Sequence, residues 1–286
     1  MRSSLHATLL VSCADGPGIV AALARFVFEQ GGNILDSDQH ADSRLGVFFT
    51  RLTFTLDGFL LARDLIAPSV EALLSPHEPT VEVRFSDETK RGAILVSKTN
   101  HCLYDLLLRQ EAGELCCEFP LVIANHDTLR GVAEHFGRAF HHVPITKETK
   151  AAQEGVIFEL LERERIDFVV LARYMQVLTP AFVDRYPNRV INIHHGFLPA
   201  FQGAKPYHQA HKRGVKLIGA SGHYVTADLD EGPIIAQSVV PVSHSDSIRD
   251  MVHKGRDLEK SVLANAVRCH VEDRILVYAN KTVVFD

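Results

Sequence analysis

Short apolar runs alternate with amphipathic segments through the last two thirds of the chain, and this alternation limits the possible folds more than any other feature. Apolar strands between amphipathic helices are typical of a mostly parallel sheet that is covered by helices on both faces. We therefore predict an α/β domain here. Strands are expected at AILVSK (93–98), FPLVIA (119–124), VPI (143–145), DFVVLA (167–172) and VINIHH (190–195), and strand-like runs close the chain at 274–279 and 281–285. Helices are expected at about 103–110, after Asp127, at about 147–165, from Pro180 and at about 247–270.

The first 86 residues have a different pattern. Their expected elements follow the order βαββαβ, which is that of ferredoxin-like domains. A polar connection, SDETKR (86–91), follows them, and 286 residues are enough for two domains. We predict one domain at 1–86 and a second at 87–286. The elements of the first are expected at 6–13, 19–30, 33–40, 47–56, 60–74 and 80–85.

Charge and cysteine content exclude several classes of protein. The net charge of -5 and the lack of a Lys/Arg block give no electrostatic footprint for nucleic acid or a membrane surface. No run approaches the roughly 20 apolar residues of a membrane helix, and His6 interrupts the signal-like start of the chain. The five cysteines contain no CxxC pair, so we expect reduced thiols and a cytoplasmic protein that acts on a small molecule.

The stretch Val190–Gln237 holds the densest set of polar groups that are able to support catalysis. Side chains alternate along a strand, so Asn192 and His194 are expected on one face of VINIHH, with His195 on the other. The later run HYVTADLDEGP (223–233) has the pattern of a strand that continues into a loop, and it carries His223 and Asp230. We interpret this stretch as an active site.

The first loop of the predicted sheet, Ser97–Cys102, contains no glycine. α/β sheets commonly bind phosphate in this loop, where glycines let backbone N–H groups approach an anion. No GxGxxG or GxxxxGK[ST] motif occurs elsewhere in the chain. We therefore expect no nucleotide cofactor.

The polar stretch resembles the folate-dependent formyltransferases. The resemblance rests on Asn192-x-His194 followed by Leu198-Pro199, and on Asp230, which lies 38 residues after Asn192 (230 minus 192). Together with GAKPYHQA (203–210), it points to the formyltetrahydrofolate deformylases and to a Rossmann-like, mostly parallel catalytic domain. Such enzymes hydrolyse 10-formyltetrahydrofolate to tetrahydrofolate and formate without a cofactor. The resemblance thus implies a supply of formate for purine synthesis and a balance of one-carbon folate pools.

Removal of a formyl group from nitrogen needs an activated nucleophile, a stabilised oxyanion and a proton for the departing amine. The resemblance gives these roles to Asp230 as the base for water, and to Asn192 and His194 as oxyanion donors. Burial beside Ile234 and Ile235 is expected to raise the pKa of Asp230. On the residues alone, Asn-x-His is also compatible with a satisfied pair at a strand end. His223 is expected to orient Asp230 rather than to react.

The resemblance also implies the folate site. Its expected residues are Met175, Val177, Leu178, His223, Val225 and Thr226, although residues 175–178 also fit an ordinary strand–helix junction. Lys205 and Tyr207 are candidates for the glutamate tail or for shaping their loop. We expect no metal, because neither His208 and His211 nor His135, His141 and His142 have a ligand spacing known from metal sites.

The segments ADGPGIV (14–20) and GGNI (31–34) resemble an ACT domain. The resemblance implies an amino-acid effector and a homo-oligomer, either a dimer or a tetramer. The alternative interpretation is a simple tight turn around Pro17. The residues expected at the effector site are Asp15, Gly16, Gly18, Asn33 and Ile34.

Two positions depart from the usual deformylase pattern, because Gly196 replaces a common serine and Gln176 a usual arginine. They put the turnover rate and the formyl donor in question. Two alternative functions remain, namely formyl transfer to an amine acceptor and a weakly active folate-binding sensor. The main reason to prefer hydrolysis is SKTNHCLYDLL (97–107), which resembles the deformylases, whereas the related glycinamide ribonucleotide formyltransferases keep a glycine-containing loop for a phosphate.

Overall fold

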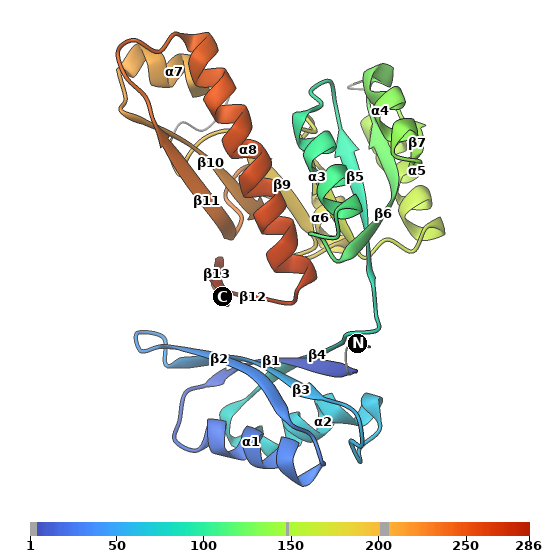
Figure 1. The fold of residues 1–286 in the computed structure, drawn as a ribbon, viewed down its shortest axis with the longest axis vertical. Helices are drawn as coiled ribbons and strands as arrows, with labels where there is room; N and C mark the ends of the chain where they lie inside the picture. The colour runs from blue at the N-terminus through green and yellow to red at the C-terminus, as the bar shows by residue number, and fades with distance from the viewer. Residues whose placement is uncertain (1–4, 147–148, 201–205) are drawn as a thin grey trace. The chain divides into compact units, whose positions relative to one another are not determined.

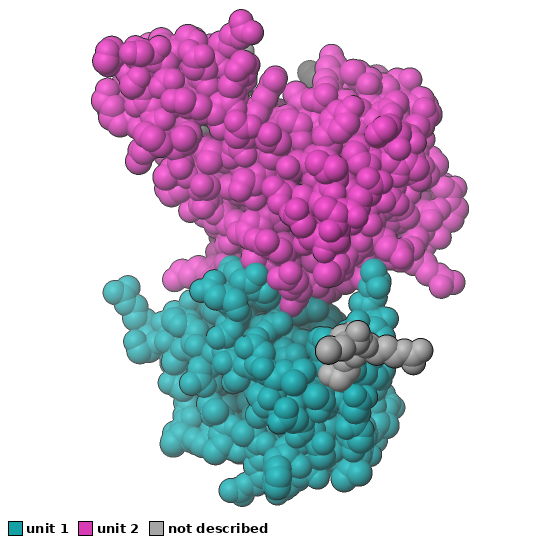
Figure 2. Space-filling model, viewed as in Figure 1, with its two compact units in different colours: residues 1–89, 273–278, 283–286 teal, residues 90–272, 279–282 magenta. Residues whose placement is uncertain are grey.

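The computed structural model describes residues 5–146, 149–200 and 206–286 (Figure 1). Contacts divide the chain into two compact units (Figure 2). Unit 1 is Met1–Thr89 with Asp273–Tyr278 and Val283–Asp286, and unit 2 is Lys90–Glu272 with Ala279–Thr282. The expected second domain ran without interruption to Asp286. The structure instead groups most of the residues after Glu272 with unit 1.

Unit 1 is a four-stranded antiparallel sheet in the order β2-β3-β1-β4, with two helices on one face (Figure 1). Its element order is the predicted βαββαβ. The bounds are β1 (His6–Ala14), α1 (Ile19–Glu29), β2 (Ile34–Asp42), β3 (Val47–Thr55), α2 (Arg63–Leu73), a 3-10 turn (Ser75–His77) and β4 (Thr80–Phe85).

The two faces of this sheet bury different parts of the chain. Leu9 and Val11 of β1 belong to the core formed with the helices. Leu10 points to the opposite face and packs with Phe49 and Phe285. That face explains the grouping of the C-terminal residues with unit 1, because an uncovered apolar face would be exposed to water. The C-terminal strands are β12 (Ile275–Tyr278) and β13 (Lys281–Val284).

Unit 2 is a seven-stranded sheet in the order β11-β10-β9-β8-β5-β6-β7. The strands from β9 to β7 are parallel, as predicted, whereas β10 and β11 are antiparallel. The strand bounds are β5 (Lys90–Val96), β6 (Cys117–Ala124), β7 (Ala139–His142), β8 (Phe168–Leu171), β9 (Val190–His194), β10 (Leu217–Tyr224) and β11 (Ile234–Pro241). The helices are α3 (His101–Glu111), α4 (Arg130–His135), α5 (Lys150–Arg163), α6 (Pro180–Arg185), α7 (Pro206–Arg213) and α8 (Ile248–Val271), with a 3-10 turn at Asp127–Leu129.

The strand predicted at 143–145 is wrong, because β7 ends at His142. Val143 still donates its N–H to the carbonyl of Ala124, but Pro144 has no N–H to continue the ladder. The apolarity of Val143 reflects its place in the core rather than a strand. No helix in the described ranges is both long and apolar enough to cross a membrane.

The polar residues of the predicted site lie where β9 pairs with the last four residues of β10. The two strands pair antiparallel, and α8 packs across β9, β10 and β11 (Figure 1). α8 begins with a capping box, in which Ser247 and Asp250 bond to each other's backbone N–H groups. Its buried face also contacts α3. Thus α3, α8, β9 and β10 surround one region of unit 2.

Candidate active site

The register of β9 and β10 brings two predicted residues together that are far apart in the sequence. His223 lies directly opposite Asn192, and their side chains meet at 3.2 Å between Nδ2 and Nε2. The carbonyl of Tyr224 lies 2.9 Å from Nδ1 of His223, so Nδ1 carries a proton. His223 is therefore fixed by contacts at both ring nitrogens.

Asp230 reaches the same place from the loop after β10. Its Oδ2 lies 3.0 Å from Nδ1 of His194, and its Oδ1 lies 3.7 Å from Nε2 of His223. The loop can fold back because residue 232 is glycine, where a Cβ would collide with the carbonyl of Tyr224. Asp230 itself has φ 57°, in the left-handed region that Asp and Asn tolerate. The structure thus brings together Asn192, His194 and Asp230.

The pKa of Asp230 was expected to rise, and this expectation is wrong. Burial does raise it, but the hydrogen bonds from His194 and His223 lower it more, so the pKa of Asp230 falls well below its usual range. The prediction failed because it counted the apolar neighbours and not the two imidazoles. Asp230 is consequently a stable carboxylate that orients His194.

The second nitrogen of His194, Nε2, is buried and has no hydrogen-bond partner among the described residues. A buried polar atom without a partner is costly, and such atoms are commonly found at functional sites. A Cβ at position 196 would lie 2.9 Å from this nitrogen, so Gly196 keeps the space beside it open. Nε2 is therefore available to a bound molecule.

A cavity of about 640 Å³ is lined by Asn192, His194 and Asp230. Its apolar wall includes Met175 and Val177, which are 59% and 51% exposed, and Leu178, which is mostly buried in the adjoining core. The volume is suited to a small organic molecule. The expected folate residues that line this cavity are Met175, Val177, Leu178, His223, Val225 and Thr226, and Gln176 lines it as well.

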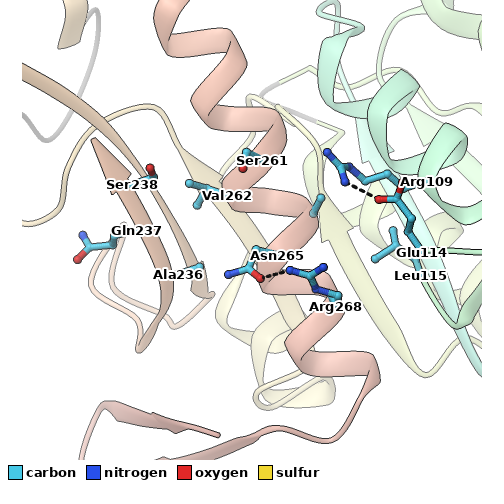
Figure 3. A pocket seen from close by; sticks show the side chains of 11 residues that line it. Arg109, Glu114, Leu115, Ala236, Gln237, Ser238, Ser261, Val262, Asn265 and Arg268 are labelled. Atoms are coloured by element: carbon cyan, nitrogen blue, oxygen red, sulfur yellow. Dashed lines mark hydrogen bonds and ion pairs between the residues drawn. The ribbon is translucent and has the colours of Figure 1, made fainter. Parts of the chain in front are cut away.

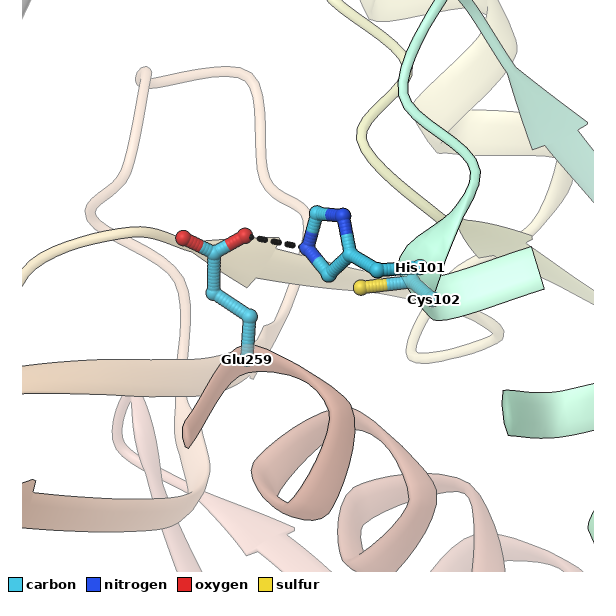
Figure 4. Close-up of side chains that lie close together, drawn as sticks. All are labelled: His101, Cys102 and Glu259. Carbon is cyan, nitrogen blue, oxygen red and sulfur yellow. Dashed lines mark hydrogen bonds and ion pairs between the residues drawn. The ribbon is translucent and has the colours of Figure 1, made fainter. Parts of the chain in front are cut away.

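A group of buried polar side chains that the sequence did not predict lies in the same cavity. Glu259 of α8 bonds to His101 of α3 (Figure 4). It also bonds to Tyr207 of α7, and Arg173 lies beside it. A signal for Glu259 was present, because it lies three and four residues before Val262 and Leu263 on the buried face of α8. Lys205 lies outside the described residues, whereas the Tyr207 hydroxyl bonds to a protein carboxylate.

One set of possible metal ligands occurs in the described part of the chain, formed by His101, Cys102 and Glu259. None of the histidines weighed from the sequence belongs to it. Burial raises the pKa of the Cys102 thiol far above its usual range, so the thiolate that binds metals is disfavoured. Arg173 already places a positive charge next to Glu259. These residues do not suit a cation.

A second cavity of about 290 Å³ lies between α3, β11 and α8 (Figure 3). None of the catalytic candidates lines it. Its two arginines are already engaged, since Arg109 pairs with Asp105 and Glu114, and Arg268 bonds to Asn265. We assign it no function.

The residues expected at the effector site do not form one cluster within the chain. Gly18, with φ 93°, and Asp15 lie in the turn after β1, close to the pairing of Ala14 with Val47. Asn33 and Ile34 lie at the other end of the sheet, where Ile34 pairs with Phe54. Gly16 lies in the same turn as Asp15, against His77. The two groups of expected effector residues are therefore separated within one chain.

Comparison with known proteins decides the family. The family model described as formyl transferase matches residues 90–267. A formyltetrahydrofolate deformylase of Synechocystis is 55% identical over 282 residues, which are 99% of both chains. Those of Bacillus subtilis and Escherichia coli are 47% and 42% identical, over 97% and 99% of this chain and 93% and 100% of theirs. This chain belongs to the formyltetrahydrofolate deformylase family.

Solved structures agree with this membership. A formyltetrahydrofolate deformylase of Pseudomonas syringae superposes with a TM-score of 0.96 at 44% identity and covers 100% of this chain and 96% of that one. A glycinamide ribonucleotide transformylase of Symbiobacterium toebii has a TM-score of 0.67 at 29% identity and covers 71% of this chain and 97% of that one. The transformylase likeness is therefore partial, whereas the deformylase likeness spans the whole chain.

Proposed function

We propose that this protein hydrolyses 10-formyltetrahydrofolate to tetrahydrofolate and formate. The observation that carries the proposal is the contact of 3.0 Å between Asp230 and His194, which leaves the other His194 nitrogen free in a cavity that Asn192 also lines. The choice of substrate rests on the family, since the relatives are named formyltetrahydrofolate deformylases. The reaction as written needs neither a metal nor a cofactor.

In the proposed mechanism, a water molecule attacks the formyl carbon. Asp230 accepts a proton from this water, and Asn192 and His194 donate hydrogen bonds to the oxygen of the tetrahedral intermediate. His194 then gives its proton to the folate nitrogen as the carbon–nitrogen bond breaks. The products are formate and the free amine of tetrahydrofolate.

The low pKa of Asp230 is compatible with its role as a base, because it is a property of the ion pair. The hydrogen bond and the charge of His194 are among the causes that lower the pKa of Asp230. When His194 gives its Nε2 proton to the leaving nitrogen, the contribution of the charge disappears, and the carboxyl group becomes a better proton acceptor. Proton uptake from water and proton delivery to folate are therefore coupled.

In this proposal, the folate ring lies against an apolar wall. The wall residues would be Met175, Val177 and Leu178, all of which line the cavity. Val225 and Thr226 lie across the same cavity, at the start of the loop that carries Asp230. Their backbone groups are suited to the hydrogen-bonding edge of the ring. Binding of the ring thus places the formyl group next to Asp230.

Release of formate from 10-formyltetrahydrofolate by the purified protein, with no amine added, tests the proposed function. The proposal expects stoichiometric formate and tetrahydrofolate. Strict dependence on an added amine would establish transfer instead, and tight folate binding without turnover would establish a sensor. The three outcomes are separated by one assay, carried out with and without amines.

We further propose that the protein is a cytoplasmic homo-oligomer, a dimer or a tetramer, with an amino-acid effector. No disulfide joins any of the five cysteines, all of which lie in the described part of the chain, as expected for a reducing compartment. The separation of Asp15 and Asn33 within one chain favours a site between two chains. Sedimentation analysis with glycine and methionine tests both proposals, because an effector between chains would shift the oligomeric state.

A further inference from the structure

The buried network around Glu259 has no role in the reaction proposed above. The Glu259 side chain is only 2% exposed, and one of its oxygens accepts a hydrogen bond of 2.7 Å from His101 (Figure 4). Its other oxygen accepts a hydrogen bond of 2.7 Å from Tyr207. Nε of Arg173 lies 3.5 Å from the same carboxylate. Burial raises the pKa of Glu259, but the combined effect of His101, Arg173 and Tyr207 in the opposite direction is larger. The pKa of Glu259 is therefore below its usual value, and the group is ionised. A buried charge costs stability even when it is paired, so a contribution to stability does not explain the presence of Glu259.

The position of this carboxylate in the fold is informative. The ligand atoms of His101, Cys102 and Glu259 all lie within 4.8 Å of one another, so Glu259 reaches the first turn of α3. In α/β sheets, the first turn after such a strand is where anions bind, at the carboxyl edge of the sheet. Here a carboxylate of the protein itself takes that place.

The same cavity connects this carboxylate with the catalytic residues. Glu259, His101, Tyr207, Asn192 and His194 all line it. A second substrate that approached the formyl group from the α3 side would therefore meet Glu259. An anionic substrate would be repelled by the charge as well as blocked by the side chains.

Gly255 allows Tyr207 to contact Glu259. At Gly255, one helical turn before Glu259, a Cβ would collide with the Tyr207 hydroxyl group. The glycine thus lets the tyrosine ring lie directly on α8. Two residues of α8 therefore contribute to this contact: Glu259 supplies the carboxylate, and Gly255 leaves room for its donor Tyr207.

We infer that Glu259 is a specificity-determining residue, which favours water over an amine acceptor with a phosphate group by placing a buried negative charge where that phosphate would bind. The inference rests on the proposed hydrolysis and explains why the same catalytic groups do not transfer the formyl group. It assigns Glu259 no contact with folate or with the attacking water.

Titration calorimetry with inorganic phosphate tests this inference. Glu259→Gln keeps the shape of the side chain and removes the charge, and it is expected to bind phosphate at least about tenfold more tightly than the wild type. Glu259→Asp is the matched control, because it keeps the charge and should resemble the wild type. Adding Arg173→Gln to Glu259→Gln should abolish the gain, which locates the phosphate at this position.

Equal phosphate affinity in the wild type, Glu259→Gln and the second neutral variant Glu259→Ala would overturn the inference. An equal gain in Glu259→Asp would also overturn it, because the charge would then not matter. Failure of both neutral variants to fold, judged by circular dichroism, would make Glu259 a structural residue and would contradict it as well. Formate release by the wild type is measured separately, so a failure of the proposed hydrolysis would be recognised independently.

Discussion

Replacement of Asp230 by asparagine removes the charge at the centre of the site while preserving its geometry. Asparagine has nearly the same shape and tolerates the left-handed backbone of this residue, at φ 57°. Its side-chain oxygen can still accept the hydrogen bond from Nδ1 of His194, which lies 3.0 Å from the carboxylate. Any loss of rate therefore reflects charge and proton transfer rather than a collapsed loop.

The expected loss follows from what the carboxylate does. An asparagine cannot take the proton of water, and it places no negative charge beside His194. General acid–base catalysis contributes about 10²- to 10⁴-fold in rate, and the two groups act as one unit, so their effects do not multiply. We expect kcat to fall about 10³-fold or more. KM should change by less than about threefold, because the folate wall is untouched.

The assay is formate release under saturating 10-formyltetrahydrofolate, with folding checked by circular dichroism. Glu231→Gln is the control. Glu231 is an exposed carboxylate in the same loop, but it does not line the cavity. It should retain wild-type activity within about a factor of two. If Asp230→Asn kept more than about a tenth of the wild-type kcat, the assignment of the base would be refuted.

Four further predictions follow from the geometry. Asn192→Ala should lower kcat about 10²- to 10³-fold with little change in KM, as expected for a lost oxyanion donor. Met175→Ser should raise KM about tenfold, because the exposed side chain is a wall for the folate ring. Asn280→Gly, which removes a hydrogen bond of 2.8 Å to the backbone carbonyl of Glu231, should lower kcat several-fold and leave the stability nearly unchanged. Burial lowers the pKa of His195 to about 4, below the unfolded value, so acidification from pH 7 to 5 should cost about 1–2 kcal/mol of stability in urea denaturation, and His195→Asn should lack this cost.

The core of the site could be predicted because it follows from local rules. Side chains alternate along a strand, so Asn192 and His194 had to share a face of β9. The alternation of apolar and amphipathic segments likewise predicted the parallel strands from β9 to β7. The position of Asp230 came from the family spacing, and the structure explains it through the antiparallel pairing of β10 with β9.

What the sequence could not reveal depends on contacts between distant segments. The pKa of Asp230 is set by two imidazoles from two different strands, and neither distance can be inferred from spacing along the chain. Glu259 meets His101 across 158 residues, so only the tertiary fold brings them together. The C-terminal strands fill a face of the first sheet that the predicted βαββαβ order left uncovered.

In the proposed mechanism, Asp230, His194 and Asn192 activate a water molecule against a formyl group. The most direct measurement is the reaction in ¹⁸O-labelled water, followed by mass spectrometry of the released formate. Formate should carry the label in one of its two oxygen atoms from the first turnover, and Asp230→Asn should remove this labelled product. Unlabelled formate, or a formyl group recovered on an amine, would contradict this mechanism.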